Sequence, residues 1–221
     1  MDWLALRLSL WLGVLTVMLL VPVALLAGRW LATTRMRGRA LIEAVIVLPM
    51  VLPPTVIGFY LLVGMGPDSL AGQLWQSLFG TGLTFSFTGI LLASVLVNVP
   101  FAVQPAQRGF EGVGQDLRDA AATCGHSAWR TFWRIELPLA WPGVVTGLVF
   151  SFAHTLGEFG VVLMVGGSIP GETRTLALSI YDRVQAFDND AAGSMAAVLM
   201  AIALVTVALT FVLGSRGSRR A

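Results

Sequence analysis

The chain has 221 residues, of which 56% are hydrophobic and only 12% charged, with a formal net charge of +2. Soluble domains carry about 25% charged residues, so this composition excludes an ordinary soluble domain and indicates a membrane protein. Because all 14 basic residues are arginine, a GxxxxGK[ST] nucleotide-binding loop is excluded, and the single cysteine, Cys124, excludes an internal disulfide.

Uncharged apolar runs predict the membrane-spanning helices. A bilayer core about 30 Å thick needs about 20 apolar helical residues. Five runs are long enough, and only Glu158 interrupts one of them: residues 8–28, 44–66, 85–105, 137–165 and 191–215. We expect the first to be a retained helix, because it exceeds the 7–15 residues of a signal-peptide core and no basic region precedes it.

The second predicted span contains three prolines, Pro49, Pro53 and Pro54, in the run VIVLPMVLPPTVIGFYLLVGMG. Each proline removes a backbone donor and crowds the preceding helical turn. A broken helix in a membrane belongs in the protein interior or beside a water-filled cavity. Pro53 and Pro54 are therefore candidate pathway or gate residues, and a merely kinked helix is the alternative.

The arginine distribution predicts the orientation of the chain. Eleven arginines lie in segments 29–39, 108–134 and 216–220, and only Arg7, Arg174 and Arg183 lie elsewhere. Since basic residues mark the cytoplasmic side, we expect an external N-terminus and a cytoplasmic C-terminus.

Residues 111–138 form an amphipathic stretch between two spans. We expect a first helix over residues 114–124 and a left-handed turn at Gly125. Ser127 is then placed to cap a second helix, which would hold Trp129, Phe132 and Trp133 against the membrane or the spans. The small residues of the first helix suit insertion into a partner's cleft; a helix resting on lipid headgroups is the alternative.

The fourth span carries Glu158, the one carboxylate inside a span. A charge at bilayer depth costs about 2.5–3.5 kcal/mol on the insertion scale, so Glu158 is expected to face the interior or an aqueous pathway. His154, Ser151 and Thr155 share its helical face and join it as pathway or gate candidates. A structural hydrogen bond between spans is the alternative, and a His–Glu pair is weak evidence for a metal or a catalytic site.

The loop over residues 166–190 is predicted to contain a surface helix rather than a sixth span. Leu176, Ile180, Val184 and Phe187 recur at helical spacing, and Thr173 or Thr175 is a plausible N-cap.

Residues 111–138 contain Asp119-Ala120-Ala121, then Gly125, then Ile135, then Leu137-Pro138. This pattern resembles a motif of ABC importer permeases: Glu-Ala-Ala, three residues, Gly, nine residues, Ile, one residue, Leu-Pro. Every spacing matches, and aspartate replaces glutamate. Because the resemblance implies contact with an ATPase, residues 111–138 are called the coupling segment below. Within that family, residues 48–62 (LPMVLPPTVIGFYLL) and 155–175 (TLGEFGVVLMVGGSIPGETRT) most resemble the molybdate permeases.

The resemblance implies an all-α, five-span type I importer permease that forms one domain over residues 1–221 in the inner membrane. It implies a homodimer, two cytoplasmic ATPase subunits and an external oxyanion-binding protein, with no cofactor, metal or nucleic acid. The residues expected to contact the ATPase are Asp119, Ala120, Ala121, Gly125 and His126; those expected to contact the binding protein are Glu172, Thr173 and Arg174.

The permease itself is expected to do no chemistry and to carry molybdate by alternating access. The alternatives in the same family are sulfate, thiosulfate or tungstate as cargo. Two alternatives belong to other functional classes of protein: a membrane-embedded enzyme and a stand-alone channel.

Overall fold

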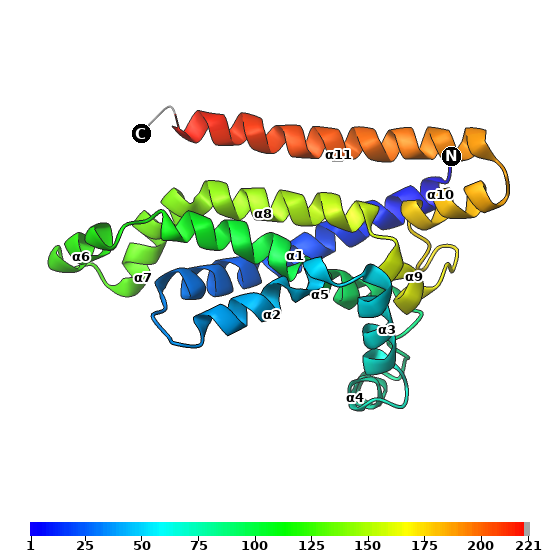
Figure 1. The fold of residues 1–221 in the computed structure, drawn as a ribbon, viewed down its shortest axis with the longest axis horizontal. Coiled ribbons are helices and arrows are strands. Elements are labelled where there is room, and N and C mark those ends of the chain that lie inside the picture. The colour runs from blue at the N-terminus through cyan, green and yellow to red at the C-terminus, as the bar shows by residue number, and fades with distance from the viewer. Residues whose placement is uncertain (219–221) are drawn as a thin grey trace.

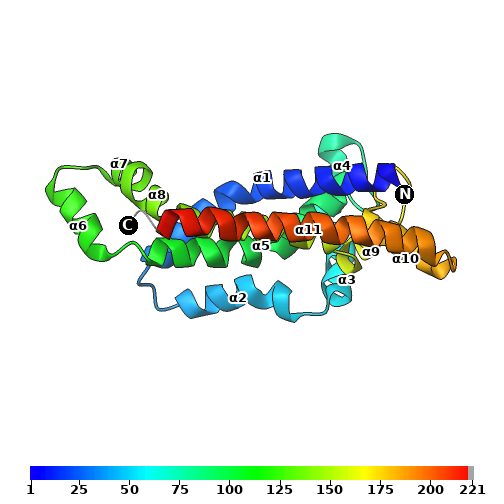
Figure 2. The ribbon, with the colours of Figure 1, turned by 90° about the horizontal axis from the view of Figure 1, so that it is seen from above.

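In a computed structural model, which describes residues 1–218, all regular structure is helical. Four long helices lie side by side in an elongated bundle (Figures 1 and 2): α1 (Trp3–Thr33), α5 (Phe87–Glu111), α8 (Leu137–Gly157) and α11 (Asn189–Ser218). Among the described residues, four helical stretches are long and apolar enough to cross a membrane, and a bent pair of helices makes five. The all-α polytopic fold is therefore confirmed. Arg219 and Arg220, which the orientation prediction used, lie outside the described residues.

Close packing of α5 between α1 and α8 forms the centre of the bundle. α8 presents Gly143 and Gly147, a GxxxG pair, toward α5. A Cβ added at Gly147 would lie 2.7 Å from the Ala102 carbonyl oxygen, so the two backbones are in direct contact. Small residues allow this approach between membrane helices, where dispersion rather than the hydrophobic effect drives association.

The second span is broken, which confirms the expectation drawn from its prolines. α2 (Arg39–Val51) and α3 (Pro54–Met65) meet at an angle of 108°. Pro54 occupies the first turn of α3, where a missing N–H costs nothing. α3 turns away from the bundle and leads to α4 (Leu70–Phe79), a short helix that the sequence analysis did not predict (Figure 1).

α3 is held to the bundle by α9 (Gly160–Gly166), and Gly58 is the point of closest approach. A Cβ at Gly58 would lie 2.7 Å from the Met164 Cβ and 3.2 Å from the Val161 Cα. We expect Gly58→Leu to lower the free energy of unfolding by about 1–3 kcal/mol, the usual cost of overpacking.

The matched control for this prediction is Gly64→Leu on the same helix, since a Cβ there meets nothing within 4 Å. Thermal unfolding of the purified protein in detergent measures both variants. Equal melting temperatures for Gly58→Leu and Gly64→Leu would contradict the packing argument.

The coupling segment extends beyond one end of the bundle as α6 (Gln115–Thr123) and α7 (Ala128–Thr131) (Figure 1). A short π-helical stretch, η1 (Phe132–Glu136), runs without interruption from α7 into α8. α10 (Leu176–Gln185) lies at the opposite end, as the surface helix predicted in the 166–190 loop. The coupling segment and α10 are thus separated by the length of the bundle.

Candidate coupling segment and transport pathway

The turn after α6 has the left-handed backbone geometry that favours glycine. Gly125 has a φ of +77°. Its N–H donates to the Ala122 carbonyl at 2.9 Å, and the His126 N–H donates to the Ala121 carbonyl at 3.0 Å, which is the Schellman pattern of helix termination. Ser127 then accepts a hydrogen bond from the Arg130 N–H at 3.3 Å and caps α7. Both expectations for this hinge are confirmed.

The structure divides the residues predicted to contact an ATPase into exposed and buried ones. Asp119, Ala120 and Gly125 are exposed, and His126 is half-buried. Ala121 is only 5% exposed, because it shares an inward face of α6 with Arg118, one turn earlier. Ala121 therefore packs against the rest of this chain. The prediction that it lies on an outer surface that contacts an ATPase is wrong.

A buried carboxylate, Glu136, fixes α6 to the bundle. Its side chain is 1% exposed and forms ion pairs with Arg29 of α1 and Arg118 of α6. The Arg118 Nε donates to Glu136 at 2.9 Å, and its Nη2 donates to the Phe110 carbonyl at the end of α5 at 3.0 Å. The Arg29 guanidinium also lies 5.4 Å from the centre of the Phe132 ring. We call Arg29, Arg118 and Glu136 the charge cluster.

The charge cluster links α6 of the coupling segment to the helices that cross the membrane. Its bonds connect α6 to α1, to the end of α5 and to η1. Sequence reasoning missed it, although Glu136 is the only acidic residue between Asp119 and Glu158 and stands at the start of an apolar run.

The three aromatic residues of the coupling segment differ in their surroundings. Phe132 is 9% exposed and stacks on Phe110 of α5, with ring centres 6.2 Å apart. Trp129 and Trp133 are 70% and 48% exposed. Phe132 therefore packs against the spans as predicted, whereas the two tryptophans are free to meet the bilayer surface, where indole rings are enriched.

Two hydroxyl residues predicted to line the pathway are buried between α5 and α8. Ser151 and Thr155 are 0% and 2% exposed. The Ser151 hydroxyl donates to the Gly147 carbonyl at 2.9 Å, and Thr155 accepts from the Asn98 amide of α5 at 3.1 Å. Because α5 covers this face of α8, the prediction that these two residues line an aqueous pathway is corrected.

Glu158 caps the helix that follows it, which differs from the hydrogen bond between spans that the structural alternative proposed. It is 5% exposed, and its Oε1 accepts a hydrogen bond from the Val161 N–H at 2.9 Å in the first turn of α9. The His154 Nε2 lies 3.7 Å from Glu158 Oε2, and the His154 ring stacks on Phe101 at 4.3 Å. Among the described residues no group of three metal-ligating side chains forms.

The bend of the second span lies next to the start of α9. A Cβ at Gly160 would be 2.7 Å from the Pro54 Cβ, and Glu158 caps the same helix. Pro53 and Pro54 are exposed at the bend. The structure thus brings the proline break and Glu158, far apart in sequence, to one place in the fold.

A cavity of about 430 Å³ between α2 and α5 was not anticipated from the sequence. Arg39, Gln104, Gln107 and Arg108 contribute to its polar wall. Arg39 pairs with Glu43 at 2.8 Å, and the Gln107 amide donates to Glu43 at 2.7 Å. The sequence signal is the polar run at the end of the third span, QPAQR.

In the 166–190 loop, Thr173 is a structural residue. It is 0% exposed; its hydroxyl donates to the Gly166 carbonyl at 2.7 Å and accepts from the Ile169 N–H at 3.0 Å. Thr175, rather than Thr173, caps α10 by accepting from the Leu178 N–H at 3.5 Å. The prediction that Thr173 contacts an external protein is therefore wrong.

The Arg174 side chain likewise bonds to residues of the same 166–190 loop. Its guanidinium donates to the Ser168 hydroxyl at 3.0 Å and to the Ser168 carbonyl at 3.1 Å, and lies 3.4 Å from Asp182 of α10. Its side chain is 31% exposed. Glu172 is the exposed member of the predicted trio.

Asp2 joins the start of α1 to α10. Its carboxylate accepts from the Ala5 N–H and from the Ser179 hydroxyl, each at 3.0 Å. Burial opposes ionisation of Asp2, but these hydrogen bonds and the charge of Arg174 outweigh it and hold the pKa below its ordinary value. The ionised carboxylate thus anchors this end of the bundle.

A family model described as "Binding-protein-dependent transport system inner membrane component" matches residues 9–215. The chain belongs to this family. The family membership places this permease in the inner membrane and confirms the resemblance seen in the coupling segment. It also decides against a membrane-embedded enzyme and a stand-alone channel.

Curated relatives of the permease include molybdenum and sulfate transport proteins. It is 50% identical over 187 residues to "Molybdenum transport system permease protein ModB" of Azotobacter vinelandii, covering 85% of this chain and 83% of that protein. The Escherichia coli K12 protein of the same name is 36% identical over 208 residues (94% and 90%). "Sulfate transport system permease protein CysW" of Synechococcus elongatus is 34% identical over 216 residues (98% and 75%).

Two solved structures share the fold of the permease. A bacterial ABC transporter involved in the import of the acidic polysaccharide alginate matches with a TM-score of 0.75 at 16% identity, covering 96% of this chain and 78% of that one. The alginate transporter in complex with an alginate pentasaccharide-bound periplasmic protein matches with a TM-score of 0.73 at 17% identity (94% and 76%). The importer permease fold is therefore confirmed.

Proposed function

We propose that this permease carries molybdate across the inner membrane as the transmembrane subunit of an ATP-driven importer. The observation that carries the proposal is the 50% identity, over 85% of the chain, to a molybdenum transport permease. The sulfate permease is a weaker relative at 34% identity. Tungstate, an oxyanion of similar shape, and sulfate or thiosulfate remain the competing cargoes that the experiment below separates.

The proposed machine contains two copies of the chain, two ATPase subunits and a binding protein that delivers the oxyanion. The family description, which names a binding protein, supports that partner. The exposed residues Asp119, Ala120 and Gly125, with His126 at their edge, offer the ATPase a small, smooth surface at one end of the bundle. Glu172, at the other end, is the candidate contact for the binding protein, which agrees with an external N-terminus and a cytoplasmic C-terminus.

In this proposal the permease undergoes alternating access as a single domain. ATP closes the ATPase subunits, and the docked α6 helices move together. The charge cluster passes the movement to the spans, which then face outward. The permease makes and breaks no bonds; its work lies in a two-state equilibrium that nucleotide shifts. The proline bend and the neighbouring Glu158–α9 contact are the proposed gate region, and the cavity between α2 and α5 is the proposed polar part of the pathway.

The test is ATP-driven uptake of labelled molybdate into liposomes that hold this permease with its ATPase and binding protein. We expect uptake that tungstate inhibits by competition and a tenfold excess of sulfate does not. Strong competition by sulfate would move the permease to the sulfate group. Absence of ATP-dependent uptake of all three oxyanions, from an intact complex that hydrolyses ATP, would refute the oxyanion assignment.

A further inference from the structure

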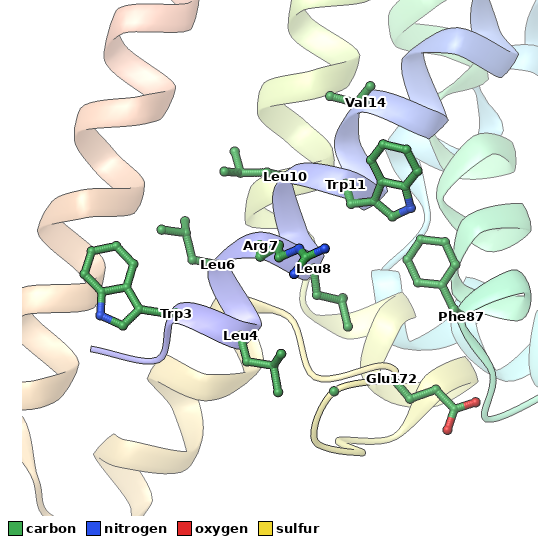
Figure 3. A pocket seen from close by; sticks show the side chains of 11 residues that line it. Trp3, Leu4, Leu6, Arg7, Leu8, Leu10, Trp11, Val14, Phe87 and Glu172 are labelled. Carbon is green, nitrogen blue, oxygen red and sulfur yellow. The ribbon is translucent and has the colours of Figure 1, made fainter.

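A groove of about 810 Å³ runs along the first three turns of α1, outside the coupling segment and the proposed gate. Its walls are α1, the start of α5 at Phe87, and Gly171 and Glu172 of the 166–190 loop (Figure 3). Most of the lining is apolar, and leucine side chains and Val14 of α1 lie along it. An apolar groove on a membrane-spanning helix is open to the acyl chains of the bilayer.

Two opposite charges, Arg7 and Glu172, also line the groove. Both are exposed, and neither forms an ion pair with any residue that the structure describes. They come from different elements, α1 and the 166–190 loop, and Figure 3 shows both side chains beside the groove. A cation and an anion held apart in this way are complementary to a ligand that carries both charges.

The position of Arg7 along α1 places it near the membrane surface. It lies four residues after Trp3, which is about 6 Å along a helix axis. Trp3 and Trp11 flank it at a spacing of four residues and share its face, with exposures of 71% and 57%. Tryptophan is enriched at the level of the lipid headgroups, so this face of α1 meets the headgroup region with Arg7 at its centre.

We propose that the groove is a binding site for phosphatidylethanolamine. The Arg7 guanidinium donates hydrogen bonds to the phosphate, a geometry for which arginine is suited. The Glu172 carboxylate accepts from the primary ammonium group, and an acyl chain follows the apolar wall past Val14. Phosphatidylglycerol offers no cation to Glu172, and phosphatidylcholine has a bulky quaternary ammonium with no N–H to donate. The site thus discriminates by headgroup.

The experiment measures thermal unfolding of the detergent-purified permease, in complex with its ATPase and without binding protein, in mixed micelles of each of the three phospholipids. A ligand that binds the folded state raises the melting temperature. We expect phosphatidylethanolamine to raise it by about 2–4 °C more than the other two lipids, the shift that about a fivefold preference gives in a chain of this size. Glu172→Gln should abolish the preference over both other lipids, and Arg7→Gln, which removes the phosphate contact that all three lipids share, should lower the stabilisation by all three.

Arg35→Gln is the matched control, because it removes an exposed arginine that is not among the groove-lining residues; it should retain the preference. Equal stabilisation of the native protein by all three lipids, or a preference that survives Glu172→Gln, would overturn the proposal. A second copy of the chain is the other possible occupant. Leu10→Cys in a Cys124→Ser background tests it, since efficient disulfide cross-linking between two chains would show that protein, rather than lipid, covers the groove.

Discussion

Replacement of Gly125 by valine is expected to leave ATP hydrolysis in place and to reduce coupled transport about tenfold or more. A β-branched residue at a φ of +77° costs about 1–3 kcal/mol in backbone strain, and 1.4 kcal/mol already corresponds to a tenfold change in an equilibrium. The strain is relieved by opening the turn, which breaks the hydrogen bonds from Gly125 and His126 and displaces the exposed end of α6. The ratio of ATP hydrolysed to molybdate imported in liposomes measures this effect.

Gly125→Asn is the control at the same position. Asparagine tolerates the left-handed conformation that ends many helices, so this variant adds a polar side chain and keeps the turn. We expect its coupling ratio to stay within about twofold of the native value, a difference of about 0.4 kcal/mol. If asparagine uncouples transport as strongly as valine, side-chain bulk at the docking surface, and not backbone strain, is responsible. If valine transports normally, the docking role of this turn is wrong.

Replacement of Glu136 by glutamine is expected to have the largest effect on both stability and coupling. It removes the charge that Arg29 and Arg118 share at a site where the glutamate side chain is 1% exposed. Breaking a buried ion pair by removing one partner costs about 3–5 kcal/mol. The lower end applies here, because 35% of the Arg29 side chain is exposed and water can solvate it. Thermal unfolding and the coupling ratio are the two measurements.

A double-mutant cycle that combines Glu136→Gln with Arg118→Gln distinguishes an interaction between the two side chains from a non-specific loss of stability. If Arg118 and Glu136 act together, the double variant loses less than the sum of the single losses, with an interaction energy of about 1 kcal/mol or more. Asp68→Asn is the control carboxylate, because Asp68 is exposed and makes no ion pair with a described residue. Additive losses in the cycle would mean that α6 is held by its hydrogen bond to Phe110 and by packing rather than by the charge cluster. Normal coupling in a destabilised Glu136→Gln protein would restrict the cluster to a structural role.

The coupling segment and the gate region differ in how far they could be predicted. The turn at Gly125 and the cap at Ser127 depend on backbone conformations and hydrogen bonds within about five residues, so local chemistry determined them. Ala121 and Thr173 were assigned to partner surfaces because of their place in a motif or loop. Their burial depends on helices that the sequence pattern does not position.

The same distinction applies to polar residues on α8. Ser151, Thr155 and Glu158 share a helical face with His154, and the periodicity of the helix determines this relation. Periodicity does not say what covers that face. In the structure α5 covers Ser151 and Thr155, which are packing groups rather than pathway residues. Glu158 caps α9 beside the proline bend, within the proposed gate region.

The sequence by itself determined that this is a membrane-spanning helical protein with a broken second span and a hinged segment between its third and fourth spans. Those features follow from apolar run length, proline chemistry, glycine conformation and short fixed spacings, all of which act over a few turns of helix. Only the tertiary structure decided that Glu136 binds Arg29, 107 residues away in the chain, together with Arg118, and that Arg7 and Glu172 line one groove. These pairings depend on how distant helices pack, and packing is set by the summed contacts of whole helix faces rather than by any local pattern.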